Sequence, residues 1–232
     1  MRLVRAADLI ATDGADPFVL VEPPFNRNAP GIAAIAPEVT GYRLLQRIWT
    51  RLGWDSMAGR TLLDYGCGVR FARTIHNLAL PIGHYTGVDV DRELIDWLAA
   101  NLTGKQFSFQ HIDAANKVYN PSGARDLALD VRDVDAVCMH SVITHHDPDE
   151  AEATLALVRP CVKDAGRLHF TAFTDDAVHG YAEADPANPG HMSTYHPDVL
   201  LDLCSAAGWR VDRIHLPDPG GLGQTTFVAT AR

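Results

Sequence analysis

The sequence predicts an α/β fold, with a parallel sheet that carries helices on both of its faces. Short apolar runs alternate along the chain with stretches of helical periodicity, which is the pattern of consecutive βαβ units. A glycine turn at 66–68 joins the first run to the first of these helical stretches. Asp64, Asp89 and Asp113 end three successive runs, at the edge where open α/β sheets bind ligands.

The expected elements follow from residue spacing. Apolar residues recur every three or four positions from Val39 to Leu52, which predicts an amphipathic helix that packs on the main domain and ends at Gly53. The expected strands are the runs 61–65, 84–90, 107–112, 135–141, 167–173, 209–216 and 225–231. The helices expected between them cover 71–80, 92–101, 149–162 and 197–207, and Gly208 ends the last one.

Length and composition limit the class of protein. With 232 residues the chain has room for one substantial core, and its net charge of −9 disfavours nucleic acid and anionic membranes as partners. Its longest apolar runs fall far short of the roughly 20 residues that span a bilayer. The four cysteines are scattered, and the N-terminus lacks the apolar segment of a secretion signal. We therefore expect a cytoplasmic protein that acts on a small molecule or a protein, with its oligomeric state left open.

The glycine turn and the acid that ends the second strand suggest a nucleotide-like ligand. Gly66 and Gly68 lack a Cβ, so the loop can adopt positive φ and a ligand can approach the backbone closely. Asp89 follows at about the spacing at which a carboxylate accepts hydrogen bonds from ribose hydroxyls. Three acids in register with a glycine turn favour a binding site over isolated helix caps.

From about residue 60 to 232 the chain resembles the class I, seven-stranded, Rossmann-like S-adenosylmethionine-dependent methyltransferases. The similar segments are DYGCG, VDVD, HIDAAN, the run from Ser141 to Phe173, YHPDVLLDLCSAAGWRVDRI and TTFVATAR. The resemblance implies a doubly wound, mostly parallel seven-stranded sheet with an antiparallel last strand, in a three-layer αβα sandwich. It implies S-adenosylmethionine as the cofactor. Arg70 stands where many members carry a third loop glycine.

The resemblance also implies a role for each matching residue. Asp64 and the loop backbone would hold the methionine end of the cofactor, Asp89 the ribose, and Asp113 with Ala114 the adenine. His140 and Ser141 would lie beneath the methyl-donor region. The cofactor residues implied are Asp64, Gly66, Cys67, Gly68, Asp89, Val90, Asp113, Ala114, His140 and Ser141.

Two alternatives stay open at this stage. The same strand, glycine loop and helix serve NAD(P)-dependent oxidoreductases, although Phe71 occupies the last glycine of their fingerprint. None of the six tyrosines is followed four residues later by lysine, as in short-chain reductases. The other alternative is a non-catalytic, ligand-binding relic of the methyltransferase fold, because a fold does not by itself imply an activity.

The candidate catalytic residues lie after the fourth strand and near the fifth helix. His145 and His146 are candidate bases for an oxygen nucleophile, and Tyr195 is a further polar candidate. Neighbouring side chains rarely converge on one ion, so no metal site is predicted at His145, His146 and Asp147. Methyl transfer to a small molecule by in-line displacement is the expected reaction.

Three segments are expected to shape the acceptor pocket. These are the N-terminal arm and the loops 119–126 and 175–197. Residues 1–37 are rich in proline, alanine and glycine and show no sustained period, so they are expected to form a movable cover. We therefore divide the chain into an N-terminal arm with its docking helix, 1–55, and a cofactor-binding domain, 56–232.

Overall fold

A computed structural model describes residues 21, 23–24, 37–117, 119–124, 127–184, 192–217 and 223–232. The strands of the main sheet are β1 (Thr61–Tyr65), β2 (His84–Asp89), β3 (Phe107–His111), β4 (Val134–Met139), β5 (Val162–Thr174), β8 (Trp209–His215) and β9 (Thr225–Ala231). The helices are α2 (Pro37–Arg51), α3 (Arg70–Asn77), α4 (Arg92–Asn101), α5 (Pro148–Val158) and α6 (Pro197–Ala206). Most of the predicted arm lies outside the described residues, and its role as a cover stays a prediction.

The main sheet has the predicted strand directions. Its strands run β3-β2-β1-β4-β5-β9-β8. The first five are parallel to one another, whereas β9 is antiparallel to both β5 and β8. The reversal of strand order between β1 and β4 places a ligand crevice at their carboxyl ends.

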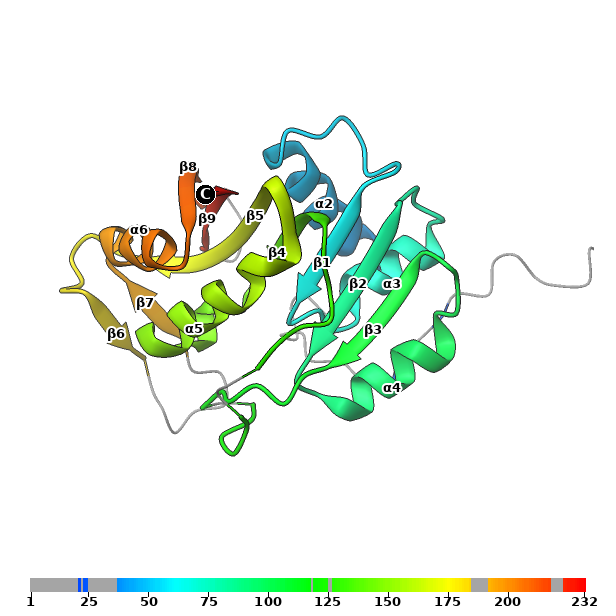
Figure 1. Cartoon of the computed structure of the whole chain (residues 1–232), viewed down its shortest axis with the longest axis horizontal. Helices are drawn as coiled ribbons and strands as arrows, with labels where there is room; N and C mark the ends of the chain where they lie inside the picture. Colours follow the sequence, from blue (N-terminus) through cyan, green and yellow to red (C-terminus); the bar gives the residue numbers. More distant parts are fainter. Residues whose placement is uncertain are drawn as a thin grey trace, which may run out of the picture.

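The two faces of the sheet are covered by different helices, because successive strand residues point to opposite sides. One core contains Leu62 of β1 together with residues of α2, α3 and α4, such as Leu45. The other contains Leu63 with residues of α5 and α6, such as Leu155. Figure 1 shows α5 in front of the strands and α3 behind them. The three-layer αβα prediction is confirmed.

The structure adds a hairpin where the sequence indicated only a loop. Strands β6 (Tyr181–Glu183) and β7 (Ser193–Tyr195) pair antiparallel, and β7 pairs in parallel with the last two residues of β5. This joins nine strands into one sheet (Figure 1). Strands of three residues are too short to show the alternation by which a strand is recognised in sequence.

Two predicted boundaries near β5 shift for a local reason. The helix expected over 149–162 ends at Val158 and continues as the 3-10 helix η3 (Arg159–Cys161), which contains Pro160. Proline lacks the N–H that an α-helix interior needs. Strand β5 consequently begins at Val162, five residues before the predicted start at Arg167.

The helix before β1 packs on the main sheet as predicted. Leu45 and Ile48 of α2 are buried in the core with α3. Near its start, Glu38 accepts a hydrogen bond from Arg73 Nε at 2.8 Å. The helices within the described ranges are too short or too polar to cross a bilayer.

Candidate functional site

The glycine loop after β1 has the conformation for which its glycines are needed. Gly66 and Gly68 have φ of +71° and +50°. The N–H groups of Gly66 and Cys67 donate to the carbonyl oxygen of Val88 at 2.8 and 3.0 Å. A Cβ on Gly66 would lie 2.6 Å from Cγ2 of Val142, so this position allows no side chain.

We expect Gly66→Ala to lower the free energy of unfolding by about 1–3 kcal/mol, because it combines a strained φ with an overlap against Val142. Gly53→Ala is the matched control: Gly53 has φ of +76°, but a Cβ there meets nothing within 4 Å. Urea unfolding of both variants separates overlap from backbone strain. Equal losses would show that the contact with Val142 costs nothing.

Asp89 closes the loop from the end of β2. Its side chain is 7% exposed. Oδ2 accepts a hydrogen bond from Gly68 N at 3.0 Å, and Oδ1 accepts one from Asp91 N at the same distance. The carboxylate thus holds the glycine loop while lining the cavity described next.

A cavity of about 260 Å³ opens at this edge of the sheet. It lies between the glycine loop, the segment after β3 and the segment after β4. Its lining residues are Tyr65, Gly66, Gly68, Asp89, Val90, Ile112, Ala114, Ala115, Asn116, Tyr119, Ser141, Val142, His145, His146 and Thr154. The sequence had singled out eight of these: Gly66, Gly68, Asp89, Val90, Ala114, Ser141, His145 and His146.

Asp64 does not line this cavity. Its side chain is 1% exposed and points to the α3 face of the sheet, where Tyr85 donates a hydrogen bond to Oδ2 at 2.5 Å. Burial raises the pKa of Asp64 to about 7, and the charge of Asp89 adds to the shift. Cys67 is also buried in the core on this face. Asp64 therefore lies beneath the glycine loop, and the Cys67 side chain anchors the loop in the core on the same face.

Asp113 holds the turn that carries the predicted adenine-side residues. Its exposed carboxylate accepts a hydrogen bond from Asn120 Nδ2 at 2.9 Å, and it lies outside the cavity lining. The same amide donates to the carbonyl oxygen of Ala114 at 3.0 Å. Asp113 therefore shapes the segment that brings Ala114 and Asn116 to the cavity.

His140 and Ser141 follow β4 and point to different surroundings. Ser141 has φ of +60°, lines the cavity, and donates its N–H to Thr171 Oγ1 at 2.9 Å. His140 lies against Phe71, with ring centroids 5.9 Å apart, and is absent from the cavity lining. Burial, together with nearby arginines, lowers the pKa of His140 to about 4.

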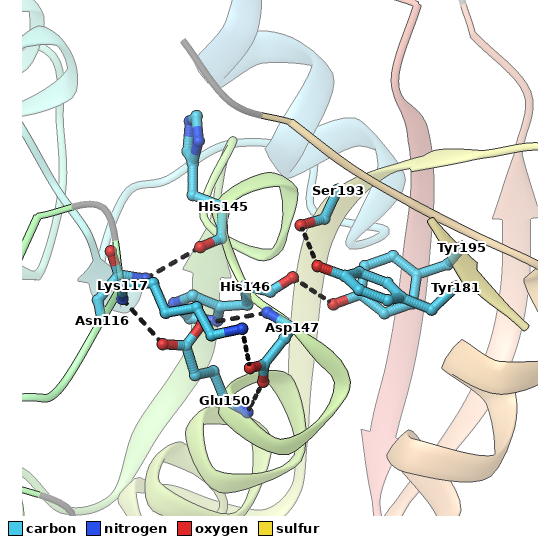
Figure 2. A network of polar contacts seen from close by, with 9 residues as sticks. All are labelled: Asn116, Lys117, His145, His146, Asp147, Glu150, Tyr181, Ser193 and Tyr195. Atoms are coloured by element: carbon cyan, nitrogen blue, oxygen red, sulfur yellow. Dashed lines mark hydrogen bonds and ion pairs between the residues drawn. The ribbon is translucent and has the colours of Figure 1, made fainter. Parts of the chain in front are cut away.

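The two neighbouring histidines differ in their surroundings. His146 is 6% exposed, and burial lowers its pKa to about 4, so it is neutral at physiological pH. His145 is half-buried, and its Nε2 lies 3.5 Å from the hydroxyl of Tyr119. In Figure 2 the His145 ring points away from the polar network that holds its backbone.

That network fixes the 3-10 helix η2 (Ile143–His145) and its following turn from two sides (Figure 2). Asn116 Nδ2 donates to the carbonyl oxygen of His145 at 3.0 Å. The hydroxyl of Tyr195 donates to the carbonyl oxygen of His146 at 2.7 Å. Tyr195 is completely buried and lies outside the cavity lining. Its hydroxyl anchors residues 143–146, which we call the histidine segment.

An ion pair and a helix cap complete the network. Lys117 Nζ lies 2.9 Å from Asp147 Oδ2. Asp147 and Glu150 form a capping box at the start of α5, and Glu150 also accepts a hydrogen bond from Lys117 N at 2.9 Å. The segment after β3 is thereby tied to the start of α5.

Several cavity residues were not singled out from the sequence, among them Asn116. Asn116 stands two positions after Ala114 in the segment HIDAAN, so its proximity to a predicted site residue was the available signal. Tyr119 begins the loop 119–126, which was expected to shape the acceptor pocket, but its approach to His145 appears only in the folded chain. Within the described ranges, no group of three or more potential metal ligands has a geometry that holds an ion.

The residues of the cavity fit a nucleoside with an amino-acid tail. A Cβ on Gly68 would meet nothing within 4 Å, so the loop offers open backbone surface there, and the carboxylate of Asp89 can accept hydrogen bonds of the kind ribose hydroxyls donate. Ile112 and Ala114 offer apolar surface to a base, while Asn116 offers a polar edge. The fold and this edge of the sheet define a Rossmann-like methyltransferase.

Comparisons with known proteins agree with this class of protein. Residues 37–214 match the family model of a methyltransferase domain, Methyltransf_23, and the chain belongs to this family. It is an S-adenosylmethionine-dependent methyltransferase, and S-adenosylmethionine is its cofactor. The family match decides against the NAD(P)-dependent oxidoreductase. No curated protein matches the sequence significantly.

Solved structures share the fold at low sequence identity. Magnesium protoporphyrin IX methyltransferase from Synechocystis PCC 6803 aligns with a TM-score of 0.60, 13% identity and 90% coverage of both chains. CalS10, an amino pentose methyltransferase from Micromonospora echinaspora, aligns with a TM-score of 0.57 and 15% identity, over 91% of this chain and 100% of its own. DesVI from Streptomyces venezuelae aligns with a TM-score of 0.56 and 15% identity, over 84% and 92%.

Proposed function

We propose that this enzyme methylates an oxygen atom of a small molecule, with His145 as the general base. The observation that carries the proposal is the position of His145. It is a half-buried imidazole in the lining of the cofactor cavity, and its neighbour His146 is buried. An imidazole at this position accepts the proton that a hydroxyl must lose to become a good nucleophile.

The chain's contribution is binding, alignment and proton removal. S-adenosylmethionine, when bound, supplies a methyl group on a sulfonium, which is displaced in line. Asp89 would bind the ribose, and Ala114 with Asn116 would border the adenine. His145 would take the acceptor's proton at Nε2, beside the hydroxyl of Tyr119. Holding the reactants in line supplies roughly 7–11 kcal/mol of the barrier reduction.

The fixed backbone of the histidine segment supports this role. Hydrogen bonds from Asn116 and Tyr195 hold the carbonyl oxygens of His145 and His146 (Figure 2). The imidazole of His145 therefore extends from a backbone that is fixed in place. Rigid support of this kind is what a base needs to keep hydrogen-bond reach of its substrate. We therefore assign Tyr195 and His146 a positioning role.

A small-molecule acceptor and a cytoplasmic location are part of the proposal. The net charge of −9 opposes approach of a nucleic acid. CalS10, one of the structural neighbours, is an amino pentose methyltransferase, which supports a small acceptor. All four cysteines are buried free thiols, as suits a reducing compartment.

Cofactor binding tests the foundation of the proposal. Asp89→Ala is expected to weaken binding of S-adenosylhomocysteine about tenfold, because a buried acceptor of hydrogen bonds contributes about 1–3 kcal/mol. Isothermal titration calorimetry measures this. Asp91→Ala is the matched control: Asp91 caps α4 by accepting from Leu94 N at 3.1 Å and lies outside the cavity lining. Unchanged affinity in Asp89→Ala would refute the ribose assignment.

Turnover tests the chemistry and the relic alternative together. The protein is screened with S-adenosylmethionine against hydroxyl-bearing small molecules, and the S-adenosylhomocysteine formed is measured. We expect turnover with at least one hydroxyl compound. Methylation confined to amines would contradict the oxygen acceptor, and tight cofactor binding without any turnover across the screen would favour the relic.

A further inference from the structure

Polar side chains occupy a buried part of the sheet that faces α2. His169 and Thr171 of β5 and Thr226 of β9 are 1%, 4% and 1% exposed. They lie on the same sheet face as Cys138 and Val228, which belong to the apolar core beneath α2. Burying polar groups in place of apolar ones costs stability, so a cluster of them on interior strands calls for a functional explanation.

Three arginines carry charge that acts on this polar patch or on His140 beside it; we call Arg47, Arg51 and Arg70 the arginine cluster. All three are half-buried. Arg47 and Arg51 are one helical turn apart on α2, and Nη1 of Arg51 donates to Thr226 Oγ1 at 2.6 Å. Arg70 begins α3 next to Phe71, whose ring lies against His140.

The positive charges of the arginine cluster act on His140. Burial is the largest cause that lowers the pKa of His140, and the charges of Arg70, Arg47 and Arg51 add to it, in that order. The charge of Arg51 also lowers the pKa of His169, after burial and the neighbouring His140.

Two buried imidazole nitrogens add a second, independent observation. Nε2 of His140 and Nε2 of His169 are buried and have no hydrogen-bond partner in the part of the chain that the structure describes. Buried polar atoms are nearly always paired, so an unpaired atom indicates a missing partner. Neutral imidazoles with Nε2–H would be hydrogen-bond donors for an anion beside the arginines.

The patch borders the cofactor cavity through one residue. Ser141 follows His140, lines the cavity, and donates its N–H to Thr171 at 2.9 Å. Its hydroxyl pairs with Gln224, which precedes β9, at 2.9 Å from Nε2. A molecule bound against the arginine cluster would therefore lie next to the methyl-donor side of the cavity.

We propose that the arginine cluster, with His140 and His169, binds an anionic group, a carboxylate or phosphate, of the methyl acceptor. Guanidinium groups match the geometry of both anions, and hydrogen bonds between charged groups are stronger than neutral ones. This inference rests on the proposed function, because it names the acceptor class for the same site. The carboxylate of the cofactor has the same chemistry, so the experiment must separate these two sources.

The first arm measures anion binding to protein saturated with S-adenosylhomocysteine. Inorganic phosphate and acetate are titrated by calorimetry into the wild type, Arg47→Gln and Arg51→Gln. We expect saturable binding of at least one anion, weakened about tenfold or more in both variants. Arg43→Gln is the matched control, because Arg43 lies exposed on the same helix. Binding of neither anion by the wild type, or an equal loss in the control, overturns the proposal.

The second arm identifies the source of the anion. The same variants are titrated with S-adenosylhomocysteine and with 5′-methylthioadenosine, which lacks the amino-acid carboxylate. We expect both affinities to stay within about twofold of the wild type. A loss for S-adenosylhomocysteine alone would assign the cluster to the cofactor and overturn the acceptor assignment. If the wild type binds neither nucleoside, the proposed function itself fails, which is a different outcome.

The test remains decisive even if one of the variants does not fold. Arg51→Gln removes the hydrogen bond to Thr226, so its thermal unfolding is measured first. If that variant does not fold, Arg47→Gln carries the test. Retained phosphate or acetate affinity in a folded Arg47→Gln would then overturn the proposal.

Discussion

Replacing His145 by alanine is expected to lower the methyl-transfer rate about 10²-fold, which corresponds to roughly 2.7 kcal/mol of transition-state stabilisation. The affinity for S-adenosylhomocysteine should stay within a few-fold, because proton removal belongs to the transition state. The rate is measured as S-adenosylhomocysteine formed from a hydroxyl acceptor identified by the screen. His84→Ala is the control: His84 contacts Ser108 at the opposite edge of the sheet.

His145→Gln separates proton removal from orientation. An amide hydrogen-bonds to a substrate but does not accept a proton at neutral pH. If His145 is the base, the glutamine variant should be nearly as slow as the alanine variant. If His145 only orients the acceptor, glutamine should restore much of the rate. A rate in His145→Ala within threefold of the wild type would contradict both roles.

The second large effect concerns stability and pH. Asp64→Asn is expected to become progressively more stable than the wild type as pH rises from about 4 to 7. The pKa of Asp64 is raised in the folded protein from 3.8 to about 7 by burial and by Asp89. Between these values the folded state binds the proton more tightly than the unfolded state. The wild type therefore loses stability as pH rises through this window.

The magnitude follows from the shift. One pKa unit corresponds to 1.36 kcal/mol, so the advantage of Asp64→Asn above pH 7 is at most about 4 kcal/mol. Below pH 4 this contribution vanishes. An amide oxygen still accepts the hydrogen bond from Tyr85, which limits other consequences of the change. Urea unfolding of both proteins at several pH values between 4 and 8 measures the difference.

Asp135→Asn should show the opposite pH dependence and serves as the control. Burial alone would raise the pKa of Asp135, but Lys163 and hydrogen bonds from Thr61 hold it below its ordinary value. Its charge stabilises the folded protein above the unfolded pKa of about 3.8 and loses that contribution as pH falls through the folded value. Asp135→Asn should therefore lose most relative stability at neutral pH. A flat profile for Asp64→Asn would contradict the buried, proton-binding carboxyl.

Asp64 and Asp89, which each lie at the end of a strand, show what a sequence pattern can and cannot predict about a site. Parallel strands end at one edge, and Asp89, at the end of β2, lines the cavity at that edge. Asp64 also ends a strand, yet alternation turns it to the α3 face and leaves Tyr65 to line the cavity. A strand-end position indicates the edge, while the face depends on the register of the strand.

The hairpin of β6 and β7 and the arginine cluster show the opposite case. Strands of three residues leave no periodic signal, and β7 forms only because the end of β5 extends beyond its pairing with β9. The arginine cluster likewise joins α2 and α3, and it acts on His140 after β4, a segment far from both in the sequence. Charges distributed in this way appear in sequence as ordinary helix-surface arginines.

The sequence by itself determined the sheet, its helices, the glycine loop and the cofactor class, because each depends on local periodicity or on a short motif. Only the tertiary structure decided the different burial of His145 and His146, which are neighbours in sequence. His145 is half-buried beside the hydroxyl of Tyr119, whereas His146 is buried. Their carbonyl oxygens are held by Asn116 after β3 and by Tyr195 on β7. Burial of a side chain depends on contacts made by distant segments, and a single sequence carries no record of which segments those are.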